Sequence, residues 1–156
     1  MNKRLIGTFV AAAVLAPALT LAGTGQAFAA GNRVTWKNNW VGGYLQYVNH
    51  RVRTSGEGVD PGQSITVWWD EFKQSDGTYV MKHDAAGKCL DSNSNGDVYL
   101  LDCNGGDYQK WYEIHKSTGW VLKDKATGLV LTGGDGGAAY TDRENQGAPV
   151  GDQYWS

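Results

Sequence analysis

The sequence lacks the features that would point to a helical fold or to a familiar enzyme. After Gly31 no stretch keeps the i, i+3, i+4, i+7 apolar spacing of an amphipathic helix over a dozen residues. There is no H-E-x-x-H, G-x-S-x-G or C-x-x-C motif, and the three histidines, His50, His83 and His115, are scattered along the chain. We therefore expect an all-β domain without catalytic activity.

Cysteine and positive charge are also scarce. The only cysteines are Cys89 and Cys103, and an even pair in an exported chain usually forms a disulfide rather than a catalytic thiol. Without residues 1–30 the chain keeps 12 basic and 16 acidic side chains, a net charge of −4. Such a balance argues against a partner held through phosphate contacts. We expect a Cys89–Cys103 disulfide and no nucleic-acid partner.

Residues 1–30 have the features of a signal peptide. A basic start is followed by an almost wholly apolar run, Leu5–Leu21, and then by the small residues of Ala27–Ala29. An uncleaved membrane anchor is the alternative, because the apolar run approaches the length of a membrane span. Polar and helix-breaking interruptions favour cleavage, after Ala29 or Ala30. We predict a secreted protein, free of the membrane after cleavage, with residues 31–156 forming one domain.

Short β-rich runs alternate with turn signals throughout the mature part. Glycine, aspartate and asparagine supply the turns, and aromatic residues are frequent enough to close the core of a small domain. The predicted strands are Val34–Trp36, Tyr44–Val48, Ser64–Trp69, Tyr79–His83, Val98–Leu101, Trp111–His115, Trp120–Asp124, Val130–Thr132 and Gln153–Trp155.

These runs repeat with a period of about 40 residues, which is typical of repeat architectures. The three repeats cover approximately residues 33–75, 76–117 and 118–156. Each passes through a step similar to Gly-x-Leu and closes near a tryptophan, at Thr66-Val67-Trp68, Gln109-Lys110-Trp111 and Gln153-Tyr154-Trp155. Because no unit can bury its own apolar side, we expect the three to close around a shared axis.

The second repeat, GKCLDSNSNGDVYLLDCNGGDYQKW from Gly87 to Trp111, resembles a repeat of the ricin B-chain type β-trefoil family, the Gln-x-Trp lectins. The resemblance is fair in the third repeat and weak in the first, where Thr66 stands in place of the motif glutamine. It implies a pseudo-threefold β-trefoil in a secreted, single-domain bacterial member of the family. It also implies that the motif tryptophans, Trp68, Trp111 and Trp155, pack in the core.

In the resembled family a sugar site combines an aspartate after the first cysteine, an aromatic ring near the second cysteine and an asparagine beside the motif glutamine. The second repeat keeps Asp91 as the acceptor of sugar hydroxyls, but Leu101 replaces the ring and Tyr108 replaces the asparagine. A tyrosine is then expected to provide stacking, with the amide side chains supporting the turn. The candidate carbohydrate-binding residues are Asp91, Tyr99, Asn104, Tyr108 and Gln109.

The other two repeats match the sugar-site pattern less well. Gln46 in the first and Thr132 in the third stand where the aspartate is expected. Arg51-Val52-Arg53 takes the place of the ring in the first repeat, and Thr141 or Asp142 takes it in the third. A polar cluster near the glycine-rich loop of the third repeat is either an atypical sugar site or a solvated loop, and its members are Asp135, Tyr140, Asp142 and Arg143.

The stretch Asp91–Asp102 also fits a calcium loop of the form D-x-N-x-N-G with a carboxylate at its twelfth position. An EF-hand loop needs a helix on each side, and the glycine- and cysteine-containing flanks cannot supply one. The same residues are expected in a trefoil hairpin turn. We therefore predict no metal site and no cofactor.

Taken together, these patterns favour a secreted, noncatalytic carbohydrate-binding module that recognises cell-surface or wall glycans. The alternative is a secreted protein-interaction module, either an inhibitor or a subunit of an extracellular assembly. The altered stacking positions are the feature that favours this alternative, because function belongs to sites grafted on a fold rather than to the fold.

Overall fold

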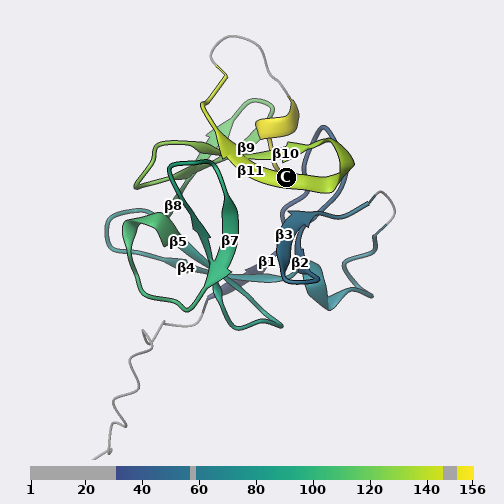
Figure 1. The fold of residues 1–156 in the computed structure, drawn as a ribbon, viewed down its shortest axis with the longest axis horizontal. Coiled ribbons are helices and arrows are strands. Elements are labelled where there is room, and N and C mark those ends of the chain that lie inside the picture. The colour runs from purple at the N-terminus through teal and green to yellow at the C-terminus, as the bar shows by residue number, and fades with distance from the viewer. Residues whose placement is uncertain (1–30, 57–58, 146–150) are drawn as a thin grey trace, which may run out of the picture.

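The computed structural model describes residues 31–56, 59–145 and 151–156, and the predicted signal peptide lies outside these residues. The described chain is all-β, as predicted, with three units around a common centre (Figure 1). Its strands are β1 (Asn32–Val34), β2 (Leu45–Val48), β3 (Arg51–Thr54), β4 (Trp69–Lys73), β5 (Tyr79–His83), β6 (Cys89–Ser92), β7 (Val98–Leu101), β8 (Trp111–Lys116), β9 (Gly119–Asp124), β10 (Val130–Gly134) and β11 (Ala138–Asp142). Four short 3-10 turns are described: η1 (Ile65–Val67), η2 (Asp107–Gln109), η3 (Asp135–Gly137) and η4 (Gly151–Gln153). In the described part of the chain, no helix has the length and apolar character to cross a membrane.

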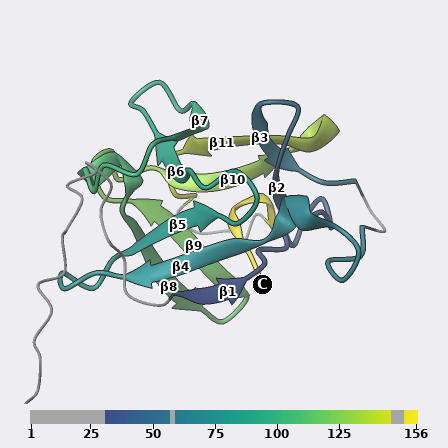
Figure 2. The ribbon, with the colours of Figure 1, turned by 90° about the horizontal axis from the view of Figure 1, so that it is seen from below.

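One set of strands forms a closed ring. Strand β4 pairs with β1 and β5, and β8 pairs with β5 and β9. The chain's last residues close the ring, because Trp155 forms bridges to both Asn38 and Trp120. The remaining strands form the hairpins β2–β3, β6–β7 and β10–β11, which lie together on one side of the ring (Figure 2). Within the described residues, closure of the ring leaves no barrel edge open to pairing with another chain.

A tryptophan at the start of the last strand of each repeat ties that repeat to its own hairpin. The three indoles are fully buried, and each Nε1–H donates to the backbone carbonyl of a buried leucine. The pairs are Trp69 with Leu45 at 3.0 Å, Trp111 with Leu90 at 3.2 Å and Trp155 with Leu131 at 3.0 Å. Burying a ring of this size while satisfying its N–H gives each unit a large share of the common core.

The first of these tryptophans is Trp69, so the prediction that Trp68 packs in the core is wrong. Trp68 is only partly buried, donates to the Pro61 carbonyl at 2.9 Å and lies under the Arg33 guanidinium at 4.6 Å. Val67, rather than Thr66, therefore occupies the place of the motif glutamine. The predicted alignment was wrong by one residue. Trp68 and Trp69 are adjacent, and no glutamine stands two positions before either of them to identify the tryptophan of the motif.

The predicted strands also need correction in the hairpins. The prediction omitted β3, β6 and β11, whose sequences RVRT, CLDS and AAYTD are polar or small-residue rich and pair through tertiary contacts. It also assigned Ser64–Trp69 to a strand, whereas Ser64 caps η1 by accepting from the Thr66 N–H, and the strand begins only at Trp69. In the last repeat, η4 precedes the bridge that Trp155 makes.

A buried polar side chain holds the turn that leads from the ring into each hairpin. In each repeat the side chain accepts one or two backbone N–H groups of that turn at 2.7–3.1 Å. The braces and the residues that donate to them are Asn38 with Trp40 and Val41, His83 with Ala86, and Asp124 with Thr127. One of the three scattered histidines is therefore a structural element of the fold.

Two glutamates from neighbouring parts of the ring share a buried site. Glu71 of β4 accepts a hydrogen bond from Trp36 Nε1 at 2.8 Å and interacts with the carboxyl group of Glu113 on β8. Burial, followed by the charge of Glu71, raises the pKa of Glu113 to about 8. Ionising both carboxyl groups would place two negative charges side by side in a buried environment, which is unfavourable. The pair therefore holds a proton at neutral pH.

We predict that Trp69→Ala destabilises the protein far more than Trp68→Ala. Removal of the fully buried indole leaves a cavity and an unpaired Leu45 carbonyl, which costs about 3–5 kcal/mol. Trp68→Ala removes a half-exposed ring and serves as the matched control, with a cost of about 1 kcal/mol. Urea unfolding of both variants measures the difference. Equal costs would show that the motif position is misassigned.

We also predict that the contribution of Glu113 to the free energy of unfolding falls as the pH rises from about 5 to 8. The pKa of Glu113 is raised in the folded protein. Between the ordinary pKa of a glutamate and this raised value, the folded protein holds a proton that the unfolded chain has released. The stabilisation is therefore lost as the pH rises through the folded-state pKa. The expected loss is on the order of 2 kcal/mol after allowance for partial exposure. Glu113→Gln should flatten this slope in thermal unfolding across the pH range. The surface variant Glu144→Gln should keep it, and an unchanged slope in Glu113→Gln would contradict the assignment.

Candidate functional site

The candidate site of the second repeat lies where its hairpin meets η2. Strand pairing places Asp91 of β6 directly opposite Tyr99 of β7, and Tyr108 of η2 lies nearby at the rim. These elements enclose a cavity of about 290 Å³. The lining residues are Asp91, Ser92, Asn93, Tyr99, Leu101, Asn104, Gly106 and Tyr108. Four of the five candidate carbohydrate-binding residues are therefore brought together.

The fifth candidate, Gln109, lies behind the cavity rather than in its lining. Its side chain is fully buried, and its Nε2 donates to Asp91 Oδ2 at 2.9 Å and to the Asp102 carbonyl at 3.1 Å. Its Oε1 accepts the Asn104 N–H at 2.9 Å. Gln109 thus uses its amide to fix the Asp91 carboxylate and the turn after Asp102. It positions the site and makes no contact with the cavity.

Asp91 is the only carboxylate in the described lining of this cavity, and it is 3% exposed. Burial raises the pKa of Asp91. Hydrogen bonds from Gln109 and Tyr99 lower it by a smaller amount. Burial also raises the pKa of Tyr99, and the negative charge of Asp91 adds to the effect. The site therefore presents a carboxylate that has lost most of its water and gains from any further hydroxyl donor.

The rim of the cavity is aromatic and apolar. Tyr108 is 47% exposed and Leu101 is 45% exposed, while Tyr99 is partly buried with its hydroxyl 3.3 Å from the Ser92 carbonyl. Exposed side chains of this size are available to a ligand ring at small cost. Tyr99 was predicted as a stacking candidate only because no ring stood at position 101. Strand register now places it across from the carboxylate.

Asn104 shapes the turn that carries the rim. Its Oδ1 accepts the Gly106 N–H at 2.7 Å, and a side chain at Gly106 would clash with that oxygen. The predicted disulfide is confirmed, since Cys89 and Cys103 are bonded with their Cα atoms 5.0 Å apart. The bond joins the start of β6 to the same turn. In the chain-entropy account, closing a loop of this length is worth roughly 3 kcal/mol.

The D-x-N-x-N-G stretch forms the hairpin turn between β6 and β7. Asn93 Oδ1 accepts the N–H groups of Asn95 and Asp97 at 2.9 and 3.1 Å, and Asn93 Nδ2 donates to Asp97 Oδ2. Gly96 takes a φ of +91° and lies against β11, where its carbonyl accepts the Thr141 N–H. These oxygens serve the turn. Within the described residues, no group of three or more His, Cys, Asp or Glu side chains is placed to hold a metal ion.

The first and third repeats place different side chains at the corresponding positions. Strand register sets Gln46 opposite Arg53 and Thr132 opposite Tyr140, where the second repeat has Asp91 opposite Tyr99. In the third repeat Gln153 binds Thr132 Oγ1 at 3.4 Å in the same manner as Gln109 binds Asp91. The supporting bond is therefore retained, while the carboxylate is found in one repeat.

The polar cluster predicted in the third repeat is divided between two places. Asp142 pairs with Val130 at the base of the hairpin, and its carboxylate accepts the Arg143 N–H at 2.7 Å. Tyr140 lies along the same strand and is 37% exposed. Asp135 is at the tip of the hairpin, in the lining of a different cavity that also contains Trp40. Trp40 was not among the predicted site residues, and nothing in its surrounding sequence marks it as exposed.

Comparison with known proteins agrees with this architecture. A family model described as ricin-type beta-trefoil lectin domain-like matches residues 61–146. The chain is similar to the designed threefold-symmetric protein ThreeFoil, at a TM-score of 0.67 and 21% identity, over 79% of this chain and 95% of that one. It is also similar to a Polyporus squamosus lectin bound to a human-type influenza-binding epitope. The TM-score is 0.68 and the sequence identity 21%, and the alignment covers 83% of this chain and 49% of the lectin.

An enzyme is among the similar structures as well. The GlcNAcα1-4Gal releasing endo-β-galactosidase from Clostridium perfringens aligns at a TM-score of 0.69 and 14% identity. The alignment covers 80% of this chain but 32% of the enzyme. At these identities the structural similarities establish a β-trefoil, and the present chain spans about half of the lectin and a third of the enzyme.

We predict that Gln109→Leu lowers the free energy of unfolding by at least about 2 kcal/mol, because it leaves the buried Asp91 carboxylate and the Asn104 N–H without their partners. The matched control is Gln63→Leu, at an exposed position that makes one weak side-chain bond. Denaturant unfolding compares the two variants. A Gln109 variant as stable as the control would exclude the positioning role.

Proposed function

Because the chain belongs to the ricin-type β-trefoil lectin domain-like family, we propose that it is a secreted, noncatalytic module that binds carbohydrate through its second repeat. The observation that carries the proposal is the buried Asp91 carboxylate at the floor of a cavity whose rim has an exposed tyrosine, Tyr108, and a partly buried one, Tyr99. This combination suits a pyranose, which has hydroxyl donors on its edge and an apolar face. The ligand class is a glycan of a cell surface or wall.

In this proposal each residue of the site has a role. Asp91 accepts hydrogen bonds from ring hydroxyls, and Gln109 holds that carboxylate in place from behind. Tyr99 or Tyr108 provides the stacking face, because position 101 has a leucine in place of an aromatic residue. Asn104 holds the turn with its Oδ1 and has its Nδ2 to offer to a sugar hydroxyl. The preformed disulfide and hairpin reduce the ordering cost of binding.

The noncatalytic part of the proposal rests on the chemistry of the cavity. Glycoside hydrolysis uses two carboxyl groups on either side of the scissile bond, about 5 to 10 Å apart. Among the described residues, Asp91 is the one carboxylate that lines this cavity. A ligand held there meets an acceptor and aromatic surface but no second carboxyl group to act as acid or nucleophile.

The alternative of a secreted protein-interaction module is favoured by the same rim. Leu101 and Tyr108 form an exposed apolar surface, and residues of this kind are enriched where proteins contact each other. The carboxylate is what separates the two functions. A carboxylate at the floor of a small cavity suits a ligand with several hydroxyl groups on its edge, whereas a flat protein surface would rest on the rim.

We predict that Asp91→Asn weakens the affinity for polysaccharide by at least tenfold, since a charge-assisted hydrogen bond is worth about 1.5–3 kcal/mol. Asparagine keeps an oxygen for Gln109, so folding is preserved better than in Asp91→Ala. The control is Asp102→Asn, whose side chain is 94% exposed and pairs only with Lys88 at the surface. Affinity electrophoresis through bacterial and fungal wall polysaccharides and through galactose-containing polymers measures retention.

Two results would count against the lectin function. If the wild-type chain is folded but migrates freely through every polysaccharide, it binds no carbohydrate, and the protein-interaction module becomes the better proposal. If wild-type and Asp91→Asn proteins are retained equally, the second repeat is not the binding site. Melting curves recorded on the same samples show whether a loss of retention reflects unfolding.

A further inference from the structure

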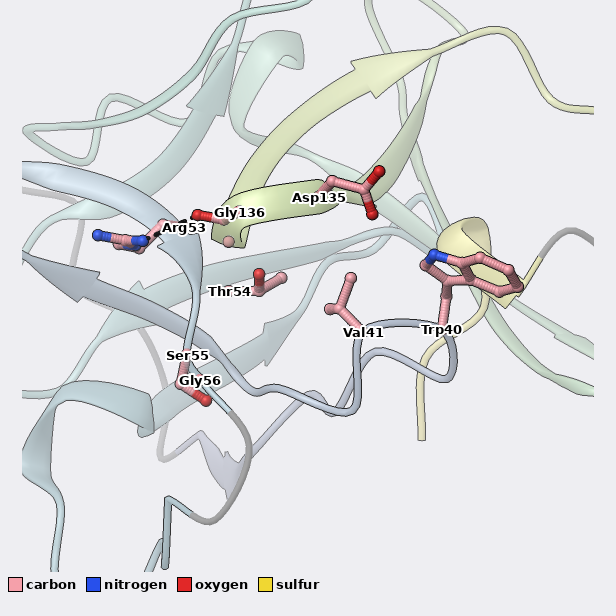
Figure 3. A pocket seen from close by; sticks show the side chains of 9 residues that line it. Trp40, Val41, Arg53, Thr54, Ser55, Gly56, Asp135 and Gly136 are labelled. Carbon is pink, nitrogen blue, oxygen red and sulfur yellow. Dashed lines mark hydrogen bonds between the residues drawn. The ribbon is translucent and has the colours of Figure 1, made fainter.

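A second cavity of about 460 Å³ lies between the first and third repeats, and it is larger than the cavity of the second repeat. Its walls come from the turn before β2, from the end of β3 with the residues after it, and from η3 (Figure 3). The lining residues are Trp40, Val41, Arg53, Thr54, Ser55, Gly56, Asp135, Gly136 and Gly137. Neither Gln46 nor Thr132, the equivalents of Asp91, is among them. The cavity is therefore separate from the site that each repeat could form by itself.

Trp40 is not required by the fold. The turn that carries it is braced by Asn38, and the corresponding turns braced by His83 and Asp124 have Ala85 and Ala126 at the equivalent position. The indole is 66% exposed, so it contributes little to the core. At the edge of a cavity the indole offers a broad apolar face that a ligand ring can cover.

Polar groups lie around the same space. In Figure 3 the Asp135 carboxylate and the Trp40 ring lie at one end of the cavity and Arg53 lies at the other. Val41 and Thr54 lie between the two ends. The Thr54 hydroxyl is buried and has no hydrogen-bond partner in the described structure, which is unusual for a buried oxygen. Asp135 is exposed and free to accept hydrogen bonds from a ligand.

The third repeat keeps this space open through its glycines. Gly136 and Gly137 have φ values of +67° and +81°, a conformation that other residues adopt at a cost. A side chain at Gly137 would also meet Arg53 Nη2 at 2.7 Å. Arg53 in turn donates to the Gly136 carbonyl at 3.1 Å, which fixes one wall of the cavity to the other. The turn of the third hairpin and the open end of the first hairpin thus form one preformed unit.

We infer that this cavity is a second saccharide site, in which Trp40 stacks on the apolar face of a neutral pyranose and Asp135 accepts its hydroxyls. The inference extends the proposed function but does not require the Asp91 site to be active. A neutral sugar suits the cavity, because its lining carries one carboxylate and one guanidinium, Asp135 and Arg53, which leave it without net charge. Two sites on one chain would raise the avidity for a polymer carrying many copies of the sugar.

The test follows the indole N–H resonances of the ¹⁵N-labelled protein during titration with methyl galactoside, glucoside, mannoside and N-acetylglucosaminide. Trp40→Ala identifies the Trp40 resonance, and its exposed position keeps the fold intact. We expect a saturable shift of this resonance in both the wild-type and the Asp91→Asn protein. Asp135→Asn should weaken the fitted affinity about tenfold. Ile65→Ala, at a position 68% exposed and outside the cavity, should leave it unchanged.

The outcomes separate this inference from the proposed function. A Trp40 shift in Asp91→Asn supports the second site even if the second repeat proves inactive. If a sugar shifts the amide of Asp91 or Tyr99 and leaves the Trp40 indole unmoved, the second site is overturned while the lectin function stands. If no sugar moves any resonance of the folded protein, both proposals fail. In the Asp91→Asn background, binding that persists unchanged after Trp40→Ala or Asp135→Asn is added also overturns the second site.

Discussion

The fold depends on one interaction made three times, the hydrogen bond from a fully buried tryptophan to the carbonyl of a hairpin leucine. Each repeat alone is a strand pair and a hairpin with too little surface to bury. The indole fills the space between them, and its bond to the backbone fixes where the hairpin sits on the ring. Because the leucine carbonyl belongs to the hairpin backbone, the residues beside it can change while the geometry stays. This constraint explains why three units that share few other side chains have the same shape.

That freedom is what makes the sites differ. The residue after each leucine is Gln46, Asp91 or Thr132, and the structure accommodates all three by adjusting the supporting bond. In the first repeat, where Val67 has replaced the glutamine, the Thr66 hydroxyl binds Gln46 instead. A carboxylate remains only where a glutamine amide and a disulfide-closed turn are both present to hold it. The candidate sugar site is therefore a property of one repeat and not of the trefoil as a whole.

The second cavity arises from the opposite situation, in which two repeats cooperate. Trp40 comes from the first repeat and Asp135 from the third, and the bond from Arg53 to Gly136 joins their hairpins. Threefold packing places the three hairpins on one side of the barrel (Figure 2), where the turn of the third hairpin meets strand β3 of the first. Here the third repeat contributes glycines in the wall, and the first contributes a ring for which the other repeats have alanine. The molecule thus offers two kinds of site on one rigid frame.

By itself, the sequence determined the fold class, the disulfide and most residues of the second-repeat site, because the motif that defines the repeat also contains its aspartate, cysteines and glutamine. It did not determine which of Trp68 and Trp69 closes the first repeat, since both satisfy the pattern and only burial distinguishes them. The strands β3, β6 and β11 were missed for a similar reason, because cross-strand pairing rather than local propensity makes them. Tertiary structure alone decided that Gln109 lies behind Asp91 and that Trp40 and Asp135 line one cavity. The members of these two pairs are 18 and 95 positions apart, and no local spacing in the sequence records a proximity that is set by the closure of the barrel.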